Sequence, residues 1–337
     1  MNEIQIGKNK IGKEDECFII AEAASNHEQN KQNAFKLIET AAGAEADSVK
    51  FQLFKASTLY SKFVDSSTYE ETSRLQLPID WIPELRDKCS SHDITFLATP
   101  FDIESIDYLA RIDIPAIKWA SGDLDNIGFL SYAAKLSKPM LIATGMSSIA
   151  DVELAVKTVT SEGNRNIALL HCISNYPTKF QDANLRMMDT LREVFEYPIG
   201  YSDHTLGISV SIAAVARGAK IIEKHFTLDK NINSPDHPFS IHPTDLKLLV
   251  KSIREVASSL GTKHKSIIPS EKKFASYGKR SIVADNYIKK GTKITSELIN
   301  YKRPGTGISP KYIQYVLGRV TEKDISKDEI ITWNHLV

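Results

Sequence analysis

Cysteine is scarce in this chain and does not occur in pairs. Cys17, Cys89 and Cys172 are the only three among 337 residues, and no CxxC spacing joins any two of them. An odd, scattered set of thiols argues against the disulfide framework that small secreted domains use. We therefore expect a protein of the reducing cytoplasm.

An excess of charge of one sign is also lacking. Lys and Arg number 42, and so do Asp and Glu, which makes the formal net charge zero. A basic surplus is what attracts nucleic acids and anionic membrane surfaces, so neither is expected as a partner. The longest apolar runs are far shorter than the about 20 residues of a membrane span. The polar residues 1–15 do not resemble a signal peptide.

Short apolar runs are abundant, and amphipathic segments separate them. We predict eight strands, at residues 18–24, 48–54, 94–101, 116–121, 140–146, 167–172, 199–204 and 221–226. Such alternation predicts an α/β fold with a parallel sheet covered by helices. Eight repeats over roughly 250 residues match a (β/α)8 TIM barrel. An open doubly wound sheet is the alternative, but no GxGxxG turn follows the first strand.

The pattern changes after a last expected helix at residues 243–260. We assign residues 1–262 to the barrel and the polar residues 263–279 to a linker. Residues 280–337 contain short strands and turns, which predicts a small β-rich domain. About 58 residues bury little core by themselves, so we expect this domain to dock on another surface.

Polar residues stand at one end of every predicted strand. Side chains two apart on a strand share a face, and the carboxyl ends of barrel strands carry the active site. In chain order these ends hold Glu22, Lys50 and Gln52, Thr99, Lys118 and Ser121, Thr144, His171 and Ser174, Ser202 and His204, and Glu223 and His225. Each residue alone is explained by a solvated or structural role, but random surface polarity would not select one end.

The chemistry of this set suits a small anionic ligand beside a metal ion. Lys50 and Lys118 supply positive charge, and the hydroxyl groups supply donors for phosphate and carboxylate oxygens. His204 and His225 lie at matching depth on strands about 5 Å apart, so they could share one divalent ion and leave positions for water and substrate. Asp203, between inward-facing neighbours, is expected to point outward.

Two carboxylates and a thiol remain. Glu22 and Glu223 are candidates for a general base or for groups that orient a ligand. Cys172 neighbours His171, but adjacent residues of a strand point to opposite faces, which argues against a Cys–His nucleophile.

Nine segments together resemble one enzyme family. They are IIAEAASNH, DSVKFQ, FLATPFD, IKWASGD, IATGMSS, LLHCISNYP, GYSDHT, EKHFT and KRPGTG, in this order along the chain. The set is similar to that of the sialic acid synthases, which make N-acylneuraminate and related nonulosonic acids from phosphoenolpyruvate. The resemblance implies a TIM barrel followed by a small antifreeze-like (SAF, β-clip) domain. It also implies a homodimer in which the small domain of one subunit caps the active site of its partner.

The resemblance also assigns roles. It implies that phosphoenolpyruvate binds Lys50, Thr99, Lys118, Ser121 and Ser202, with Thr144 as a further candidate. It implies that His204 and His225 hold Mn²⁺ or Mg²⁺, and that Glu22 is the catalytic carboxylate. The residues placed at an N-acetylated amino sugar are Gln52, Phe101, Asp123, Tyr176 and Asp236. Ser174 and Glu223 complete the candidate set on the substrate and catalytic sides. Arg303 would reach into the partner's site; a surface-turn arginine before Pro304 is the alternative.

Two positions depart from the family. Many members have a glycine directly after Asn-His, where this chain has Glu28-Gln29, and Glu45 stands where a glycine is usual before the second strand. We expect altered local geometry there rather than lost chemistry. The connection at residues 53–76 is long and lacks clear periodicity, which is typical of a substrate lid.

Three other functions stay open. A Schiff-base aldolase would use Lys50, Lys118 or Lys224 with a depressed pKa. A phosphoenolpyruvate condensation with a phosphorylated sugar would need a second phosphate-binding cluster, and the sequence shows none. A carbohydrate-binding or ice-binding protein led by the C-terminal domain would leave the polar residues of the barrel idle.

Overall fold

A computed structural model describes residues 2–61, 63 and 65–337 of the chain. The chain divides into two compact units, residues 1–261 and 262–337, and each is described here by itself.

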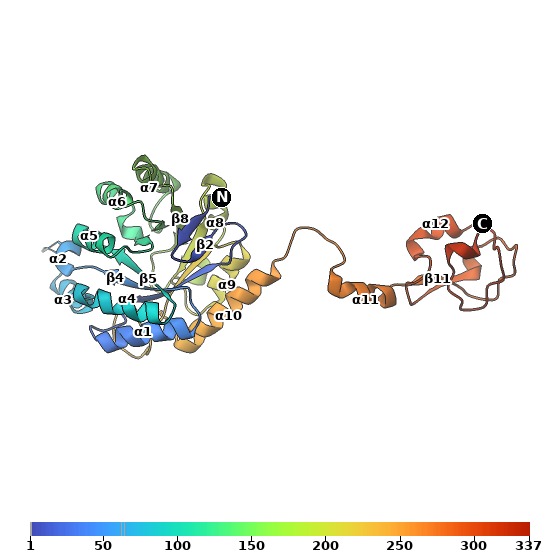
Figure 1. The fold of residues 1–337 in the computed structure, drawn as a ribbon, viewed down its shortest axis with the longest axis horizontal. Helices are drawn as coiled ribbons and strands as arrows, with labels where there is room; N and C mark the ends of the chain where they lie inside the picture. The colour runs from blue at the N-terminus through green and yellow to red at the C-terminus, as the bar shows by residue number, and fades with distance from the viewer. Residues whose placement is uncertain (1, 62, 64) are drawn as a thin grey trace. The chain divides into compact units, whose positions relative to one another are not determined.

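Parallel strands close into a barrel in the first unit (Figure 1). Within the described residues these strands are β3 (Phe18–Ala24), β4 (Ser48–Leu53), β5 (Thr95–Pro100), β6 (Ile117–Trp119), β7 (Met140–Ala143), β8 (Ile167–Cys172), β9 (Ile199–Asp203) and β10 (Ile221–His225). Strand β10 closes the ring on β3, from Ile221 opposite Phe18 to His225 opposite Glu22. The predicted TIM barrel, with a strand at each predicted place, is therefore confirmed.

Helices cover the outside of the barrel (Figure 1). They are α1 (Lys31–Gly43), α4 (Ile82–Ser91), α5 (Ile103–Arg111), α6 (Ile127–Ala134), α7 (Ile149–Ser161), α8 (Met187–Val194), α9 (Ser209–Ala216) and α10 (Pro243–Ser259). Helix α1 illustrates why these segments are helical. Its residues Ala34, Leu37, Ile38 and Ala41 fall on one face and are buried, and the side chain of Asn30 accepts hydrogen bonds from the first backbone N–H groups.

A β-hairpin fills the N-terminal end of the barrel. Strands β1 (Ile4–Ile6) and β2 (Asn9–Ile11) pair in antiparallel fashion. Their buried isoleucines join one apolar cluster with inward-facing side chains of the barrel strands, which are Phe18, Ile20, Leu97, Ala116, Leu141, Ala168, Leu170 and Ile221. Because apolar residues occupy this lower layer, the polar residues that point inward are displaced to the C-terminal ends of the strands.

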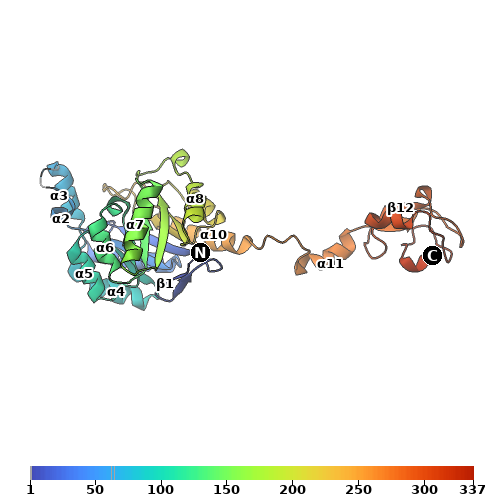
Figure 2. The same ribbon diagram turned by 90° about the horizontal axis from the view of Figure 1, so that it is seen from above.

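The predicted lid contains two helices rather than an irregular loop. Helices α2 (Ala56–Leu59) and α3 (Ser66–Leu75) occupy much of residues 53–76, of which Lys62 and Val64 lie outside the described residues. Helix α3 buries none of its residues, and for this reason the sequence shows no apolar periodicity there. In Figure 2, α3 and β1 lie at opposite ends of the barrel.

The second unit has an apolar core of its own. It contains α11 (Pro269–Gly278), the antiparallel pair β11 (Ser281–Ala284) and β12 (Ile299–Lys302), and α12 (Ile313–Val316). Its buried cluster includes Ile282, Ile288, Ile294, Ile325 and Ile331. Helix α11 lies within the residues that the sequence assigns to a linker, and it buries no side chain, which explains the polar sequence.

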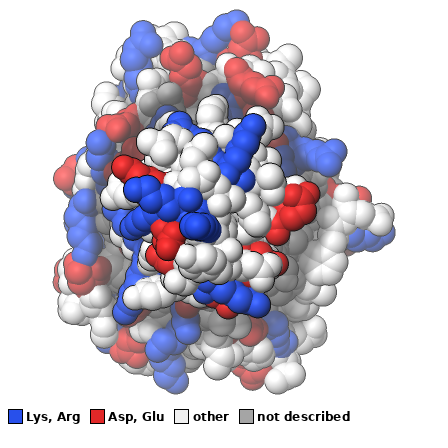
Figure 3. Space-filling model, turned by 90° about the vertical axis from the view of Figure 1, so that its right-hand side faces the viewer, with Lys and Arg blue, Asp and Glu red and all other residues white. Residues whose placement is uncertain are grey.

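Charge of both signs is spread over the surface. Figure 3 draws one face, on which Lys and Arg alternate with Asp and Glu, as the balanced composition predicts. Among the described residues, no helix combines the length and the apolar character that a bilayer span requires.

Gly200 is a sensitive point of the barrel. A Cβ atom there would lie 2.4 Å from Leu170 Cδ2 and 2.6 Å from the carbonyl oxygen of Ile221. We expect Gly200→Ala to lower the free energy of unfolding by about 1–3 kcal/mol, because the packed interior of the barrel cannot move aside. Urea denaturation measures the change. The control is Gly43→Ala at the end of α1, where a Cβ meets nothing within 4 Å and stability should hold or rise slightly. Equal stabilities for the two variants would contradict this account of the core.

Candidate active site

A cavity of about 660 Å³ opens at the C-terminal ends of the barrel strands. Every residue to which the family resemblance assigns a place in the site lines it except Thr144 and Arg303. The strand register explains the convergence. Glu223 is level with Ser202, and His225 is level with Glu22, which itself is level with Lys50 on the next strand. The predicted meeting of the two lysines, the two carboxylates and the two imidazoles in one cavity is thus what the structure shows.

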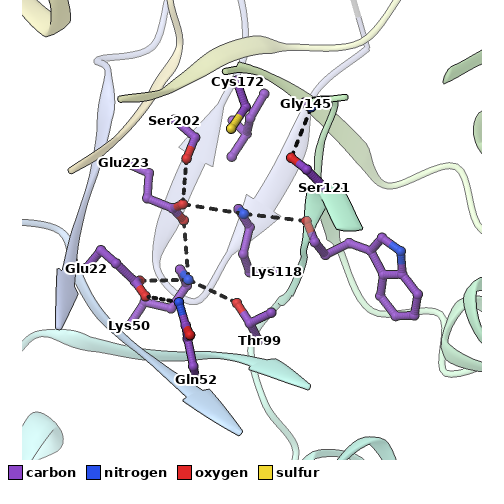
Figure 4. Close-up of polar contacts among 12 residues, drawn as sticks. Glu22, Lys50, Gln52, Thr99, Lys118, Ser121, Gly145, Cys172, Ser202 and Glu223 are labelled. Atoms are coloured by element: carbon purple, nitrogen blue, oxygen red, sulfur yellow. Dashed lines mark hydrogen bonds and ion pairs between the residues drawn. The ribbon is translucent and has the colours of Figure 1, made fainter. Parts of the chain in front are cut away.

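The lysines and glutamates form one buried network (Figure 4). Lys50 Nζ lies 2.7 Å from Glu22 Oε2 and 3.6 Å from Glu223 Oε2, and it donates to Thr99 Oγ1 at 2.9 Å. Lys118 Nζ lies 3.4 Å from Glu223 Oε1, which also accepts a hydrogen bond of 2.8 Å from Ser202 Oγ. Before any ligand binds, both ammonium groups are therefore paired with carboxylates.

The two carboxyl groups have opposite tendencies. Burial raises the pKa of Glu22, and the negative charge of Glu223 adds to that rise against the opposing field of Lys50. Burial acts on Glu223 in the same sense, but Lys118, Lys50 and the Ser202 hydroxyl hold its pKa below the usual value. Glu223 is thus the permanent anion, and Glu22 is the group that can carry a proton.

The pKa of Lys50 bears on the Schiff-base alternative. Burial alone would lower it, but the charges of Glu22 and Glu223 raise it above the ordinary value. An ammonium group held in this way is a poor nucleophile, because only the neutral amine attacks a carbonyl group.

The two histidines can hold a metal ion. Their ring centroids are 5.4 Å apart. His204 Nδ1 lies 3.0 Å from the carbonyl oxygen of Ile173, which can only accept, so in the neutral ring the other nitrogen keeps a lone pair for a metal ion. Burial lowers the pKa of His204, but Cys172 and the Ile173 carbonyl group outweigh burial and raise this pKa, so a metal ion would have to displace a proton from the ring. His225 Nδ1 is buried without a hydrogen-bond partner among the described residues. Burial and then the charge of His204 hold the pKa of His225 well below its usual value, which keeps this ring neutral, as ligation requires.

These residues fit a metal that is completed by other ligands. Among the described residues, no group of three or more His, Cys, Asp or Glu side chains is arranged to hold an ion. The two imidazoles would therefore leave most of the coordination shell to water and substrate, as a Lewis-acid site needs.

Cys172 lines the cavity, although the sequence analysis considered it only as a nucleophile and argued against that role. His171 points away from the cavity and its Nε2 donates to the carbonyl oxygen of Ala183 at 2.9 Å, so the two neighbours do face opposite ways. Cys172 Sγ lies 3.8 Å from His204 Nδ1 on the next strand. Burial would raise the pKa of this thiol, but the hydrogen bond and charge of His204 lower it below the ordinary value.

Thr144 and Arg303 are not part of this cavity. Strand β7 ends at Ala143, which lines the cavity, and Thr144 is one residue out of phase with it. The Thr144 hydroxyl donates to the carbonyl oxygen of Leu170 and lines a neighbouring hollow. The structure therefore does not bring Thr144 together with the other candidates, and its role in binding substrate stays a prediction. Arg303 is exposed on the second unit, so its role stays a prediction.

Gly145 shapes the wall beside Ser121. A Cβ atom at Gly145 would lie 2.5 Å from Ser174 Oγ and 2.9 Å from Ser121 Oγ. The backbone N–H of Gly145 donates to Ser121 Oγ at 3.0 Å. That hydroxyl oxygen accepts the backbone bond, and its own proton is left for the Cys172 sulfur or for a ligand in the cavity.

Aromatic residues line the side next to the histidines. The centroid of the Phe239 ring lies 4.9 Å from the centroid of the His225 ring and 6.2 Å from that of His204. The ring centroids of Tyr176 and His204 are 4.3 Å apart. Phe239 follows β10 by fourteen residues, so no strand pattern could have placed it here. Only its nearness in the sequence to Asp236, which is predicted to contact the amino sugar, could have indicated that Phe239 lies at the site.

Asp203 and Lys224 form a second ion pair behind the histidines, on the outward face that the sequence predicts for Asp203. Lys224 Nζ lies 3.0 Å from Asp203 Oδ2, and both side chains are buried. The carboxylate also accepts from Ser211 Oγ at 2.6 Å and from the backbone N–H of Thr205 at 2.8 Å. Burial lowers the pKa of Lys224 while Asp203 opposes the shift. Lys224 is not among the lining residues, which argues against its use as a Schiff-base lysine.

Breaking this pair should be costly. We expect Lys224→Met to lower the free energy of unfolding by about 3–5 kcal/mol, because it leaves the Asp203 carboxylate buried without its partner. The double variant with Asp203→Asn should recover part of the loss. The control is Lys157→Met, which breaks an exposed pair with Glu153 on α7 and should leave stability close to that of the parent. Similar urea midpoints for Lys224→Met and Lys157→Met would refute the role of the buried pair.

His27 makes stability depend on pH. The ring is buried beside Phe51 and Trp81, and its Nδ1 accepts from the backbone N–H of Gln29 at 3.0 Å. Burial lowers its pKa to about 4, although the charge of Glu28 acts in the opposite direction.

The unfolded chain therefore binds a proton at His27 more readily than the folded chain. We expect the contribution of His27 to stability to be complete above about pH 6.5 and to be lost as the pH falls toward 4, by about 3 kcal/mol in total. In His27→Asn, an amide oxygen can replace Nδ1 as acceptor, and the slope of stability against pH in this window should decrease. Denaturation at several pH values gives both slopes, and parallel slopes would be inconsistent with the buried neutral ring.

Comparison with known proteins shows the family of this chain. Residues 37–265 match the NeuB family and residues 279–337 match the SAF domain. An uncharacterized protein of Methanocaldococcus jannaschii is 42% identical over 100% of this chain and 99% of its own. The N,N'-diacetyllegionaminic acid synthase of Campylobacter jejuni is 39% identical over 93% of this chain and 98% of its own. The pseudaminic acid synthase of the same species is 33% identical over 96% of each.

A solved structure shares the architecture. The crystal structure of N-acetylneuraminic acid synthetase from Leptospira borgpetersenii, in complex with citrate, has a TM-score of 0.76 and 34% identity, and the match covers 81% of this chain and 95% of that one. The relatives named above with an activity are synthases of nonulosonic acids. The chain therefore belongs to the NeuB family, the sialic acid synthases that its motifs indicate, and it carries a C-terminal SAF domain.

Proposed function

We propose that the protein condenses phosphoenolpyruvate with an open-chain N-acetylated amino sugar to give a nine-carbon 2-keto acid and phosphate. The observation that carries this proposal is the meeting of two lysines, two carboxylates and two imidazoles in one cavity at the mouth of the barrel. The sugar would be N-acetylmannosamine or a 2,4-diacetamido-trideoxyhexose, and the product N-acetylneuraminate, legionaminate or pseudaminate.

Phosphoenolpyruvate would bind at the lysine side of the cavity. Lys50 and Lys118 attract its phosphate and carboxylate groups, and the hydroxyl groups of Thr99, Ser121 and Ser202 supply further donors. A proton on Glu22 would remove one of the two negative charges that face the lysines. The site would then offer a net positive charge to the anion in a medium where water is scarce.

The amino sugar would bind at the outer side. Gln52, Phe101, Asp123, Tyr176 and Asp236 line the cavity there and come from five different parts of the chain. They combine ring faces with carboxylate and amide groups, which is the mixture that a sugar with apolar and hydroxylated faces requires.

The reaction forms one carbon–carbon bond and breaks one bond to phosphate. The methylene carbon of phosphoenolpyruvate attacks the aldehyde carbon of the sugar, and the aldehyde oxygen becomes a hydroxyl group. Water adds to the carbon that bore the phosphate group, and phosphate leaves as that carbon becomes the keto group. Glu22, whose pKa is raised, would hold or move a proton at the water, while Lys50 and Lys118 stabilise the charge on the departing phosphate.

His204 and His225 would hold Mn²⁺ or Mg²⁺ here. Such an ion supplies Lewis acidity toward the sugar carbonyl group. We further propose that the protein works as a cytoplasmic homodimer, in which Arg303 of the SAF domain reaches the active site of the partner. The exposure of Arg303 supports its contact with a partner subunit. The free state of Cys17, Cys89 and Cys172 supports a reducing compartment.

One assay tests the reaction. The protein is incubated with phosphoenolpyruvate, Mn²⁺ and a panel of N-acetylmannosamine, its 6-phosphate and 2,4-diacetamido-trideoxyhexoses, and phosphate release is measured. We expect release with at least one sugar and loss of release with a chelator. Lys118→Met should lower kcat/KM by at least about 100-fold, since it removes a charge at the phosphate. The exposed Lys135→Met is the control and should behave as the parent.

Other results would point elsewhere. Trapping of a sugar by borohydride would indicate a Schiff-base aldolase, and turnover of the 6-phosphate alone would indicate a phosphorylated substrate. Sugar binding that survives Lys118→Met, without phosphate release by the parent, would indicate a carbohydrate-binding protein.

A further inference from the structure

The turn between β3 and α1 holds two consecutive residues in the left-handed region. Glu28 has φ 49° and Gln29 has φ 47°. This conformation is unfavourable for residues with a Cβ, and two in succession are unusual outside glycine-containing turns. A strained conformation persists where the surrounding contacts enforce it, so the contacts of these two side chains indicate what the turn does.

Glu28 reaches one wall of the active site. Its Oε1 accepts from His237 Nε2 at 2.9 Å, and the His237 ring is completely buried. On its other side, His237 Nδ1 lies 2.6 Å from Thr227 Oγ1 and 2.8 Å from the carbonyl oxygen of Asp229. His237 is thus tied at both ring nitrogens to the loop that follows β10 and to the turn that follows β3.

The loop that His237 fastens contributes to the cavity. Residues 226–242 connect β10 with α10, and within them Pro235, Asp236 and Phe239 line the cavity on both sides of His237 in the sequence. A shift of His237 would therefore carry Asp236 and the ring of Phe239 with it.

Gln29 reaches a different wall. Its Nε2 donates to the carbonyl oxygens of Ser73 and Gln76, at 3.3 and 3.2 Å, at the C-terminal end of α3. The side chain of Gln76 in turn accepts from the backbone N–H of Ala56 at 3.0 Å, where α2 begins. Helix α2 carries Leu59, which lines the cavity.

We propose that Glu28 and Gln29 are positioning residues that fasten the two walls of the amino-sugar pocket to the rim of the barrel. Glu28 fixes the loop at residues 229–239, and Gln29 fixes the α2–α3 segment. The two side chains make these separate contacts from consecutive residues that are both held in the left-handed conformation. These contacts determine how tightly the amino sugar is bound, and this kinetic part of the proposal rests on the proposed function. The mechanical part, which is that Glu28 and Gln29 hold the two segments in place, does not rest on it.

The base of the loop is held separately. Asn26 Nδ2 donates to the carbonyl oxygen of Phe226 at 2.7 Å and to Ser240 Oγ at 3.1 Å. Loss of the Glu28 contact should therefore loosen residues 229–239 without unfolding the barrel.

Glycine substitutions give a sharp test. Glu28→Gly and Gln29→Gly remove the side chains but suit the left-handed backbone, so neither should lower the thermal midpoint. Glu28→Gln keeps an oxygen that can accept from His237 and should behave as the parent. The matched control is Glu45→Gly, because Glu45 is also left-handed, with φ 63°, but is exposed and has no side-chain hydrogen bond or ion pair among the described residues.

Hydrogen–deuterium exchange measures the mechanical part on the full-length protein. We expect Glu28→Gly to speed exchange at least 10-fold in residues 229–239 and to leave residues 66–76 unchanged. Gln29→Gly should show the reverse pattern, and Glu45→Gly and Glu28→Gln should match the parent in both segments. Unchanged exchange in both glycine variants, or equal changes in Glu45→Gly, would overturn the proposal.

Steady-state kinetics measure the consequence for the sugar. We expect the KM for the amino sugar to rise about 10-fold in each of the two glycine variants, with a smaller change in kcat and in the KM for phosphoenolpyruvate. A uniform fall of kcat with unchanged KM would overturn the positioning role. If the parent protein turns over no sugar, the proposed function fails, and the exchange experiment still decides the fastening.

Discussion

Two lysines and two glutamates are buried side by side in the barrel, and each charge is tolerable there only because of the others. Lys50 bridges Glu22 and Glu223, and Lys118 faces the second oxygen of Glu223. A lone charge at such a place would either lose or gain a proton or draw water into the core. The closed parallel sheet supplies the geometry, because its register sets Glu22 opposite Lys50 and Glu223 opposite Ser202, and all four charged side chains line one cavity.

When both carboxyl groups are ionised, the charges of the two glutamates balance those of the two lysines. In the proposed function, phosphoenolpyruvate would add negative charge of its own. The difference in pKa between Glu22 and Glu223 would then decide which carboxyl group takes up a proton. A proton gained by Glu22 leaves the lysines to the ligand, whereas Glu223 stays ionised under the hydrogen bond from Ser202. One buried network can thus both attract a substrate and manage a proton.

Much of this could be predicted from the sequence, because two regularities are simple. Buried parallel strands appear as short apolar runs, and inward-facing residues of a strand are two apart, so Lys50 with Gln52 and Glu223 with His225 were assigned to one cavity. The ends of strands are less regular. Thr144 does not line the cavity, because it is one residue out of phase with Ala143, which does.

Other features depend on contacts that no local pattern encodes. Cys172 meets His204 because β8 and β9 are neighbours and His204 lies two residues beyond Ser202, which is opposite Cys172. Phe239 returns to the histidines from a loop. Helix α3 escaped notice because a helix without a buried face has no apolar period. The pairing of each lysine with a glutamate also required coordinates, since composition shows which charges exist but not which ones touch.

The hairpin formed by β1 and β2 adds no group to the chemistry, yet it affects the electrostatic environment of the charged layer above it. Ile4, Ile6 and Ile11 keep the floor of the barrel dry, directly under the layer of charges. Trimming those few residues would let solvent enter from below and raise the local dielectric constant, which weakens every attraction between the ammonium and carboxylate groups. A segment remote from the charged groups thereby keeps the dielectric constant around them low.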